Sequence, residues 1–177
     1  MRQARLGVMV FCGSLFTFLM RRYIRVLLLL VSVLLLFGGW QLGRPYLFIR
    51  GEGKTIATLP AAAGDELVIR FIHSVQKTPV EEYLVVEDGG LVLKKTRYRS
   101  LGVGLPFLAT EGSFKGEDGW FVFDNMNRKF PSLSLRPGVG TRLTAEFSGR
   151  EYRLYELLPL GARVDISIGR YYEKLCR

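Results

Sequence analysis

Hydrophobic and polar positions divide the chain at about Arg44 into two parts with different patterns. Before that point the sequence is almost continuously apolar and is flanked by arginines, and the first acidic residue of the chain is Glu52. After it, short segments alternate between apolar and polar positions and are separated by glycine turns. A continuous apolar run predicts a membrane-spanning helix, whereas alternation with a period of two predicts β-strands. We therefore expect residues 1–44 to form a membrane-anchor region and residues 45–177 to form a β-domain.

The segment Tyr23–Leu42 is the expected transmembrane helix. About twenty residues at about 1.5 Å per residue span about 30 Å, the thickness of the hydrocarbon core of a bilayer. Arg21, Arg22 and Arg25 lie at its N-terminal end, and such basic flanks stay in the cytoplasm. This predicts a single-pass protein of the cytoplasmic membrane with an extracytoplasmic C-terminal domain. A cleaved signal peptide is the alternative, although Gly38-Gly39-Trp40-Gln41 lacks a small-x-small cleavage site.

The first nineteen residues leave two interpretations open. Leu6–Met20 is a second apolar stretch, but as a helix it would be about 22 Å long, which is short for a span. Met20 is followed by Arg21 and Arg22, as in an ordinary translation start, so residues 1–19 are either an artefact of gene annotation or a real extension. If they insert into the membrane, residues 21–25 become a tight cytoplasmic loop. The expected location of the β-domain is the same in both cases.

The charge of the chain follows the same division. Six of the nine net positive charges come from arginines up to Arg44, whereas from Pro45 onward 19 basic and 16 acidic residues leave +3. A nucleic-acid-binding protein needs a basic face on its folded domain, so we read the charge as a membrane-topology signal and expect no nucleic-acid partner. The cysteines, Cys12 and Cys176, offer no paired spacing for a metal, and no cofactor motif occurs, so we expect neither group.

Alternating segments after Arg44 predict the strands of the β-domain. Three sets of apolar residues each share one face: Leu67, Ile69 and Phe71; Leu143, Ala145 and Phe147; Val164, Ile166 and Ile168. Turn-forming residues follow at Gly64-Asp65, Asp88-Gly89, Asp118-Gly119, Ser148-Gly149 and Pro159-Leu160-Gly161. Regularly spaced short strands of this kind predict a mainly β fold, either a β-sandwich or a small β-barrel. Tyr46–Arg50 is the expected first strand.

Three neighbouring strands between residues 69 and 97 can be placed in register. The two assumptions are that Gln76–Pro79 is a four-residue loop and that Asp88-Gly89 is a type I′ turn. They predict these facing pairs: Val75 and Val80, His73 and Glu82, Phe71 and Leu84, Ile69 and Val86, Val86 and Leu91, Leu84 and Leu93, and Glu82 and Lys95. Every apolar residue then faces another apolar residue.

This register predicts a polar row of His73, Glu82 and Lys95 across the three strands, with Arg97 further along on the same face. Directly opposed side chains have Cβ atoms about 4.5–5.5 Å apart, close enough to hydrogen-bond or pair charges. The row is either a pocket that binds an anion or transfers a proton, or a structural row that fixes the strand register. Ser74 would point to the opposite face, and no Gly-x-Ser-x-Gly elbow occurs, so we do not expect an enzyme.

The segment Gly102-Val103-Gly104-Leu105-Pro106 is the other local feature, and it predicts either a ligand-facing loop or a bend between strands. Together with His73-Ser74-Val75 and Thr78-Pro79-Val80-Glu81-Glu82, it resembles the bacterial family catalogued as domain of unknown function 1850. The resemblance covers roughly Tyr46 to Pro106, and Val103 is bulkier than the residue expected between the two glycines. It points to these residues: His73, Ser74, Pro79, Glu82, Gly102, Gly104 and Pro106.

Members of this family are similar in being small and membrane-anchored. Their genes often lie beside TRAP-type transporters of the TAXI class, which import organic acids with an extracytoplasmic binding protein. The resemblance therefore implies an accessory protein of such a transporter, with the permease or the solute receptor as partner. The alternative that follows from the polar row is a β-domain that binds a small carboxylate through His73, Glu82 and Lys95.

Overall fold

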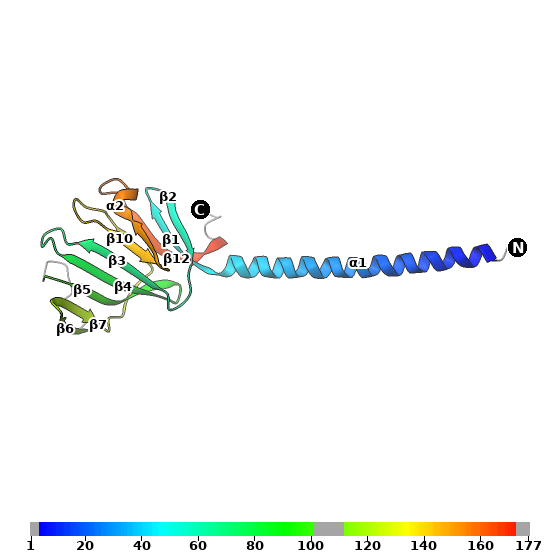
Figure 1. Cartoon of the computed structure of the whole chain (residues 1–177), viewed down its shortest axis with the longest axis horizontal. Helices are drawn as coiled ribbons and strands as arrows, with labels where there is room; N and C mark the ends of the chain where they lie inside the picture. Colours follow the sequence, from blue (N-terminus) through cyan, green and yellow to red (C-terminus); the bar gives the residue numbers. More distant parts are fainter. Residues whose placement is uncertain (1–3, 101–111, 173–177) are drawn as a thin grey trace. The chain divides into compact units, whose positions relative to one another are not determined.

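The structure is a computed structural model of the 177-residue chain, and it describes the backbone of residues 4–100 and 112–172 and the side chains from Met20 onward within those ranges. The chain divides after Gly43 into two compact units, a helix and a β-domain (Figure 1). Each unit is described by itself below.

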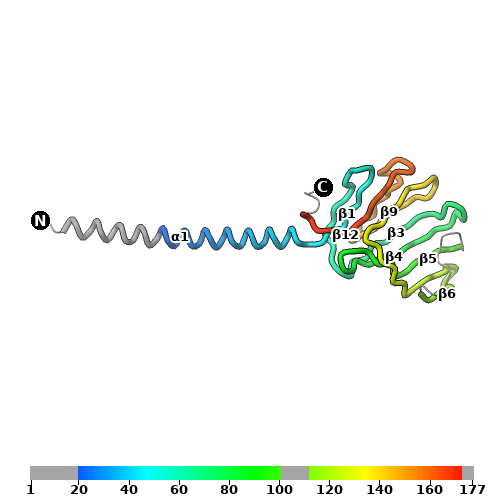
Figure 2. Tube along the Cα trace, turned by 180° about the vertical axis from the view of Figure 1, so that it is seen from behind, coloured from blue at the N-terminus to red at the C-terminus, as the bar shows by residue number. Residues whose placement is uncertain are grey.

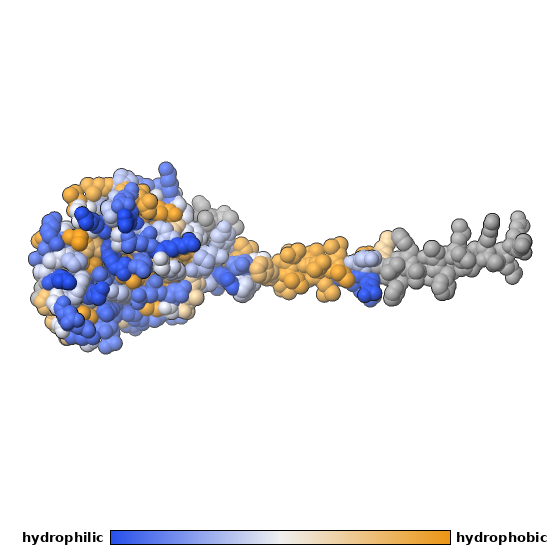
Figure 3. Space-filling view, viewed as in Figure 1, coloured by the Kyte–Doolittle hydropathy of each residue, from blue (hydrophilic) through white to orange (hydrophobic). Residues whose placement is uncertain are grey.

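The helical unit is a single helix, α1 (Ala4–Gly43). Its segment Met20–Gly43 has 24 residues and a mean hydropathy of 2.2, which is long and apolar enough to cross a membrane. Figure 3 shows an apolar surface along most of this segment, with hydrophilic residues at its N-terminal end. The helix continues without a break through residues 21–25, so the tight loop expected for a second inserted segment is not formed.

The β-domain is built from short strands, as the alternating pattern predicts. In the described residues these are β1 (Pro45–Gly51), β2 (Lys54–Pro60), β3 (Glu66–Ile72), β4 (Pro79–Glu87), β5 (Gly90–Tyr98), β6 (Ser113–Glu117), β7 (Trp120–Asp124), β8 (Arg128–Phe130), β9 (Ser132–Leu135), β10 (Thr144–Phe147), β11 (Arg150–Arg153) and β12 (Val164–Arg170), with one helical turn, α2 (Leu154–Leu157).

The strands form two antiparallel sheets that face each other as a sandwich (Figures 1 and 2). The small sheet has the order β2-β1-β12-β9, and the large sheet has the order β11-β10-β3-β4-β5-β7-β6. Strand β8 pairs with the first half of β5, while β7 pairs with its second half. The chain then crosses from the large to the small sheet at Pro131, between β8 and β9. The prediction of a mainly β domain is confirmed, and of its two alternatives the structure forms the β-sandwich and not the small β-barrel.

The main hydrophobic core lies between the two sheets, and a second, smaller cluster contains Val80 and Tyr98. Leu47, Ile49 and Ile166 enter the main core from the small sheet, and Leu84 and Phe147 enter it from the large sheet, all fully buried. The three predicted apolar sets all belong to this core or pack against it. The predicted turns are also present, because Asp88-Gly89, Asp118-Gly119 and Ser148-Gly149 all adopt positive φ at both residues, as a type I′ turn requires.

The predicted register between β3 and β4 is wrong. Phe71 faces Val80, and Ile69 faces Glu82, so the pairing is shifted from the one expected. The shift arises because the loop, residues 73–78, is centred two residues earlier in the chain than the predicted loop Gln76–Pro79. The backbone N–H of His73 donates to the carbonyl of Thr78 (2.9 Å), and the N–H of Lys77 donates to the carbonyl of His73 (2.9 Å). These two hydrogen bonds close the turn before His73 can join the strand.

The predicted register between β4 and β5 is right near the turn and wrong beyond it. Leu84 faces Leu93 as expected, but a β-bulge at Lys94 then makes Tyr83 face Lys95 and Glu82 face Thr96. The carbonyl of Lys94 accepts a hydrogen bond from the N–H of Met126 (3.0 Å), which satisfies the extra residue. The bulge turns every later residue of β5 to the face opposite the predicted one.

Candidate functional site

The polar row predicted from the sequence is not formed. His73 lies in the turn after β3, and Glu82 lies on the inner face of the large sheet. Lys95 and Arg97 lie on the outer face of the same sheet because of the bulge at Lys94. The geometry therefore contradicts a pocket made jointly by His73, Glu82 and Lys95. The glycine motif with Gly102, Gly104 and Pro106 lies outside the described residues.

His73 caps the turn that it begins. Its imidazole Nδ1 accepts hydrogen bonds from the backbone N–H groups of Val75 (3.3 Å) and Gln76 (3.2 Å), and only 8% of the residue is exposed. Nδ1 therefore acts as the acceptor that fixes the orientation of the ring in this turn. Ser74 is exposed in the same turn, and Pro79 begins β4. These contacts agree with a structural role for His73 in setting the length of the loop.

Glu82 is a carboxylic acid on the core side of the sheet. It lies between Ile69 on β3 and Thr96 on β5, both of which are fully buried, and the hydroxyl of Thr96 lies 3.8 Å from the sulfur of Met126. Burial raises the pKa of Glu82, and the charge of Arg128 only partly offsets this. A carboxyl group in such surroundings keeps its proton to higher pH than an exposed glutamate does. It is therefore able to donate a hydrogen bond or exchange a proton.

Glu81, one residue earlier, is the centre of an ionic cluster on the outer face. Its Oε2 lies 2.7 Å from both Nε and Nη2 of Arg97 and accepts a hydrogen bond of 2.5 Å from the hydroxyl of Tyr83. Nε of Arg70 lies 3.8 Å from Oε1. Burial alone would raise the pKa of Glu81, but the hydrogen bonds from Arg97 and Tyr83 and the nearby cations lower it. Burial and the hydrogen bond to Glu81 raise the pKa of Tyr83 to about 12.

Aromatic rings lie against three cations on or next to β5, Lys95, Arg97 and Arg99. Nζ of Lys95 lies 5.3 Å from the ring centre of Tyr83, and the guanidinium carbons of Arg97 and Arg99 each lie 4.8 Å from a ring of Trp120. Such cation–π contacts stabilise a charge while leaving part of it accessible. Sequence reasoning missed Glu81, Tyr83 and Trp120 as members of one cluster, because only the bulge brings Lys95 and Arg97 to their side of the sheet.

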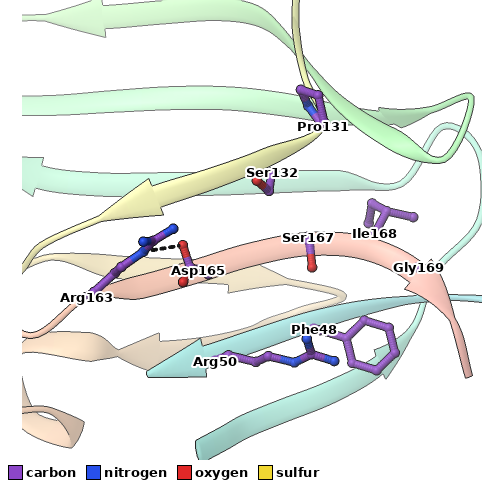
Figure 4. A pocket seen from close by; sticks show the side chains of 9 residues that line it. All are labelled: Phe48, Arg50, Pro131, Ser132, Arg163, Asp165, Ser167, Ile168 and Gly169. Carbon is purple, nitrogen blue, oxygen red and sulfur yellow. Dashed lines mark hydrogen bonds and ion pairs between the residues drawn. The ribbon is translucent and has the colours of Figure 1, made fainter. Parts of the chain in front are cut away.

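A pocket of about 400 Å³ lies on the outer face of the small sheet, over β1, β12 and β9 (Figure 4). Its middle is formed by short side chains, because Ser167 on β12 lies opposite Ser132 on β9 and two residues before Gly169. Longer side chains border this hollow, among them Phe48 and Arg50 of β1. The sequence signal for this pocket is the small residues at alternate positions of β9 and β12.

Charges line one end of the pocket. Nε of Arg163 lies 2.9 Å from Oδ1 of Asp165, and Nη2 of Arg163 donates a hydrogen bond of 3.1 Å to the hydroxyl of Ser134. Ser134 also hydrogen-bonds Asp165. The hydrogen bond from Ser134 and the neighbouring Arg163 lower the pKa of Asp165, so this carboxylate stays ionised. Among the residues whose side chains are described, no group of three His, Cys, Asp or Glu side chains is arranged to hold a metal ion.

Comparison with known proteins gives one match. A family model described as a domain of unknown function (DUF1850) matches residues 67–154, which run from the start of β3 to the start of α2. This stretch holds most of the large sheet, together with the turn of His73 and with Glu81 and Glu82 of β4. No curated protein and no solved structure matches the chain. The large sheet is therefore the part of the molecule that is similar to the family.

Proposed function

We propose that this chain is a single-pass membrane protein whose β-sandwich works outside the cytoplasm as an accessory protein of a TAXI-class TRAP transporter for organic acids. The observation that carries the proposal is one apolar helix long enough to span a bilayer, followed at once by a folded β-domain that matches a domain of unknown function. The link to this transporter class comes from the family resemblance of the motifs around His73 and Glu82.

The charges beside the apolar helix support the orientation. Arg21, Arg22 and Arg25 precede the longest apolar run, whereas Arg44 is the single basic residue between the helix and β1. The flank with more basic residues stays in the cytoplasm. The β-domain is then on the other side, where a solute receptor of such a transporter works.

The short connection between the two units supports a partner in the membrane. Helix α1 ends at Gly43 and strand β1 begins at Pro45, so only Arg44 separates them. A linker of one residue gives the β-domain a reach of a few ångströms beyond the end of its anchor. A partner that the domain contacts must therefore lie at the membrane surface or come to it, as a permease or a docked solute receptor does.

Orientation is tested with reporters fused after Arg177. Alkaline phosphatase becomes active only outside the cytoplasm. Green fluorescent protein that is exported in an unfolded state does not become fluorescent there. We therefore expect phosphatase activity without fluorescence. Replacement of Arg21, Arg22 and Arg25 by asparagine should weaken this preference, while Arg44→Asn should leave it unchanged. Fluorescence without phosphatase activity would overturn the proposed function.

Partnership is tested by purification of the tagged full-length chain in a mild detergent. We expect the transporter permease or its solute receptor to co-purify, and we expect organic-acid uptake to fall in a strain that lacks the gene. The matched control is the same α1 helix fused to an unrelated extracytoplasmic domain. Normal uptake in the deletion strain together with the absence of both transporter proteins from the purified sample would remove the proposal.

A further inference from the structure

We propose that the pocket on the outer face of the small sheet binds a small organic carboxylate and that Arg50 pairs with its charge. The pocket lies outside the stretch that matches the family model, apart from Pro131 and Ser132 at its edge. The inference does not depend on the proposed transport role, since it concerns what this pocket holds and not which protein the domain contacts.

The first argument is the state of the Arg50 guanidinium. Asp165 faces Arg50 on the neighbouring strand, but its carboxylate is bound by Arg163 and Ser134 instead. Within the described part of the chain no acidic side chain forms an ion pair with Arg50. The guanidinium carbon instead lies 5.1 Å from the ring centre of Phe48. A ring contact of this kind holds the planar group in place and leaves its N–H edge open to a ligand.

Arg50 differs from the arginines of the domain that pair with carboxylates, and it shares its contact with an aromatic ring with Arg99 and Arg128. Arg70 and Arg97 on the large sheet both pair with glutamates, and Arg153 pairs with Glu151. Arg50 borders a pocket, and the carboxylate that faces it, Asp165, is bound by Arg163 and Ser134. A cation at the edge of a hollow whose facing carboxylate is bound by other groups is a ready partner for an anion from outside.

The second argument is the chemistry of the pocket floor. Ser132 and Ser167 lie opposite each other on β9 and β12, and neither hydroxyl has a hydrogen-bond partner among the described residues. Figure 4 shows Ser167 on β12, with Ser132 of β9 on one side of that strand and Arg50 of β1 on the other. Each hydroxyl has a proton to donate to a carboxylate oxygen. A volume of about 400 Å³ suits a small molecule.

The third argument is the charge balance. The charges of Arg163 and Asp165 neutralise each other. The charge of Arg50 therefore gives the pocket a net charge of +1, which matches a monoanion. The flat fork of a guanidinium fits a carboxylate with two parallel hydrogen bonds. Phe48, Pro131 and Ile168 supply apolar surface at the border. A carboxylate with a small hydrocarbon body is therefore the ligand class that fits.

The test is isothermal titration calorimetry of the full-length chain in phosphatidylcholine nanodiscs. The probes are acetate, benzoate and inorganic phosphate, and a second set of nanodiscs contains phosphatidylglycerol. We expect saturable binding of benzoate, weaker binding of acetate, and no competition by phosphate or by the anionic lipid. If phosphate or phosphatidylglycerol binds and the carboxylates do not, the carboxylate assignment is wrong.

Variants locate the site. We expect Arg50→Gln to weaken benzoate binding at least tenfold. The affinity of Arg50→Lys for benzoate should lie between those of Arg50→Gln and the wild type, because lysine keeps the positive charge but lacks the paired N–H donors of the guanidinium. Arg150→Gln removes an exposed arginine of the large sheet and should leave binding unchanged. A thermal melt of each protein verifies that it is folded. The proposal fails if the folded wild type binds none of the acids, or if both Arg50 variants bind benzoate as the wild type does.

Discussion

Glu81 and Glu82 are neighbours in sequence, yet the two faces of the large sheet give them opposite electrostatic environments. Glu81 on the outer face accepts hydrogen bonds from Nε of Arg97 and the hydroxyl of Tyr83 and forms an ion pair with Nη2 of Arg97, and its pKa is lowered. Glu82 on the inner face lies between two fully buried residues, and its pKa is raised. Strand alternation alone separates them, because successive side chains of a strand point to opposite faces.

The comparison teaches that the face on which a residue lies decides its chemistry more than its type does. The partners of each glutamate are set by the bulge at Lys94 in the neighbouring strand. The bulge places Arg97 beside Glu81 and Thr96 beside Glu82. A regular strand would have reversed this pairing and placed cations on the core side.

The largest expected effect tests the face assignment of β5. Tyr98 is fully buried, whereas Lys95 is partly exposed beside the ring of Tyr83. We expect Tyr98→Ala to lower the free energy of unfolding by about 3–5 kcal/mol, because it leaves a large cavity in the buried cluster that Tyr98 forms with Val80. We expect Lys95→Ala to change it by less than about 0.5 kcal/mol. Urea denaturation of both proteins measures the difference, and the reverse ranking would mean that β5 has no bulge.

Much of the fold can be predicted from the sequence because its signals are local. The apolar run of the helix, the alternation in sets such as Val164, Ile166 and Ile168, and the turn at Asp88-Gly89 each act within a few residues. A continuous apolar run and strict alternation also exclude each other, so the two parts of the chain separate clearly.

The candidate sites could not be predicted in the same way. The bulge falls in Lys94-Lys95-Thr96, where a run of polar residues gives no apolar position to mark the inner face. His73 leaves the strand because of hydrogen bonds within its own turn, which the hydrophobic pattern does not show. The pocket on the small sheet combines Arg50 with Ser132 and Ser167, which are far apart in sequence and meet only through the order of the strands.

The next expected effect concerns the inner face. Glu82→Gln removes the charge that burial opposes and keeps the shape of the side chain, so we expect it to raise the free energy of unfolding at pH 7 by about 1–2 kcal/mol. Because the folded pKa lies above the unfolded value of about 4.3, the folded wild type binds the proton more tightly. The free energy of unfolding of the wild type should therefore rise as pH falls through the folded pKa of Glu82, and this rise should be complete below the unfolded pKa.

Chemical denaturation at pH values between 4 and 8 measures this contribution as the difference between wild type and Glu82→Gln. The difference in the free energy of unfolding between the two proteins should decrease as pH falls. Glu146→Gln on β10 is a control, since it removes a half-exposed outer carboxylate of the same sheet. A variant at Glu82 that is less stable than the wild type at pH 7 would show that the carboxylate is favourably bound in the core.

A smaller effect of opposite sign is expected on the outer face. Glu81→Gln removes the charge with which Arg97 and Arg70 both interact. We expect it to lower the free energy of unfolding by only about 1 kcal/mol, because these arginines are partly exposed and solvent screens their charges. The folded pKa of Glu81 is lowered, so its contribution is fully present above the unfolded value and is lost as pH falls through the folded one. In the same denaturation series, the difference in the free energy of unfolding between wild type and Glu81→Gln should decrease toward acidic pH. A difference that does not change with pH would contradict the ionic cluster.

The smallest effect separates geometry from charge within that cluster. Arg97→Lys keeps the cation beside Glu81 but removes the pair of donors, Nε and Nη2, that both lie 2.7 Å from Oε2. Lysine is a point charge and cannot reproduce this arrangement. We expect Arg97→Lys to lower the free energy of unfolding by about 0.5 kcal/mol, less than Glu81→Gln does, because the Coulomb attraction between the two charges remains. If Arg97→Lys costs as much as Glu81→Gln in the same urea series, the fork of the guanidinium and not its charge holds the outer face together.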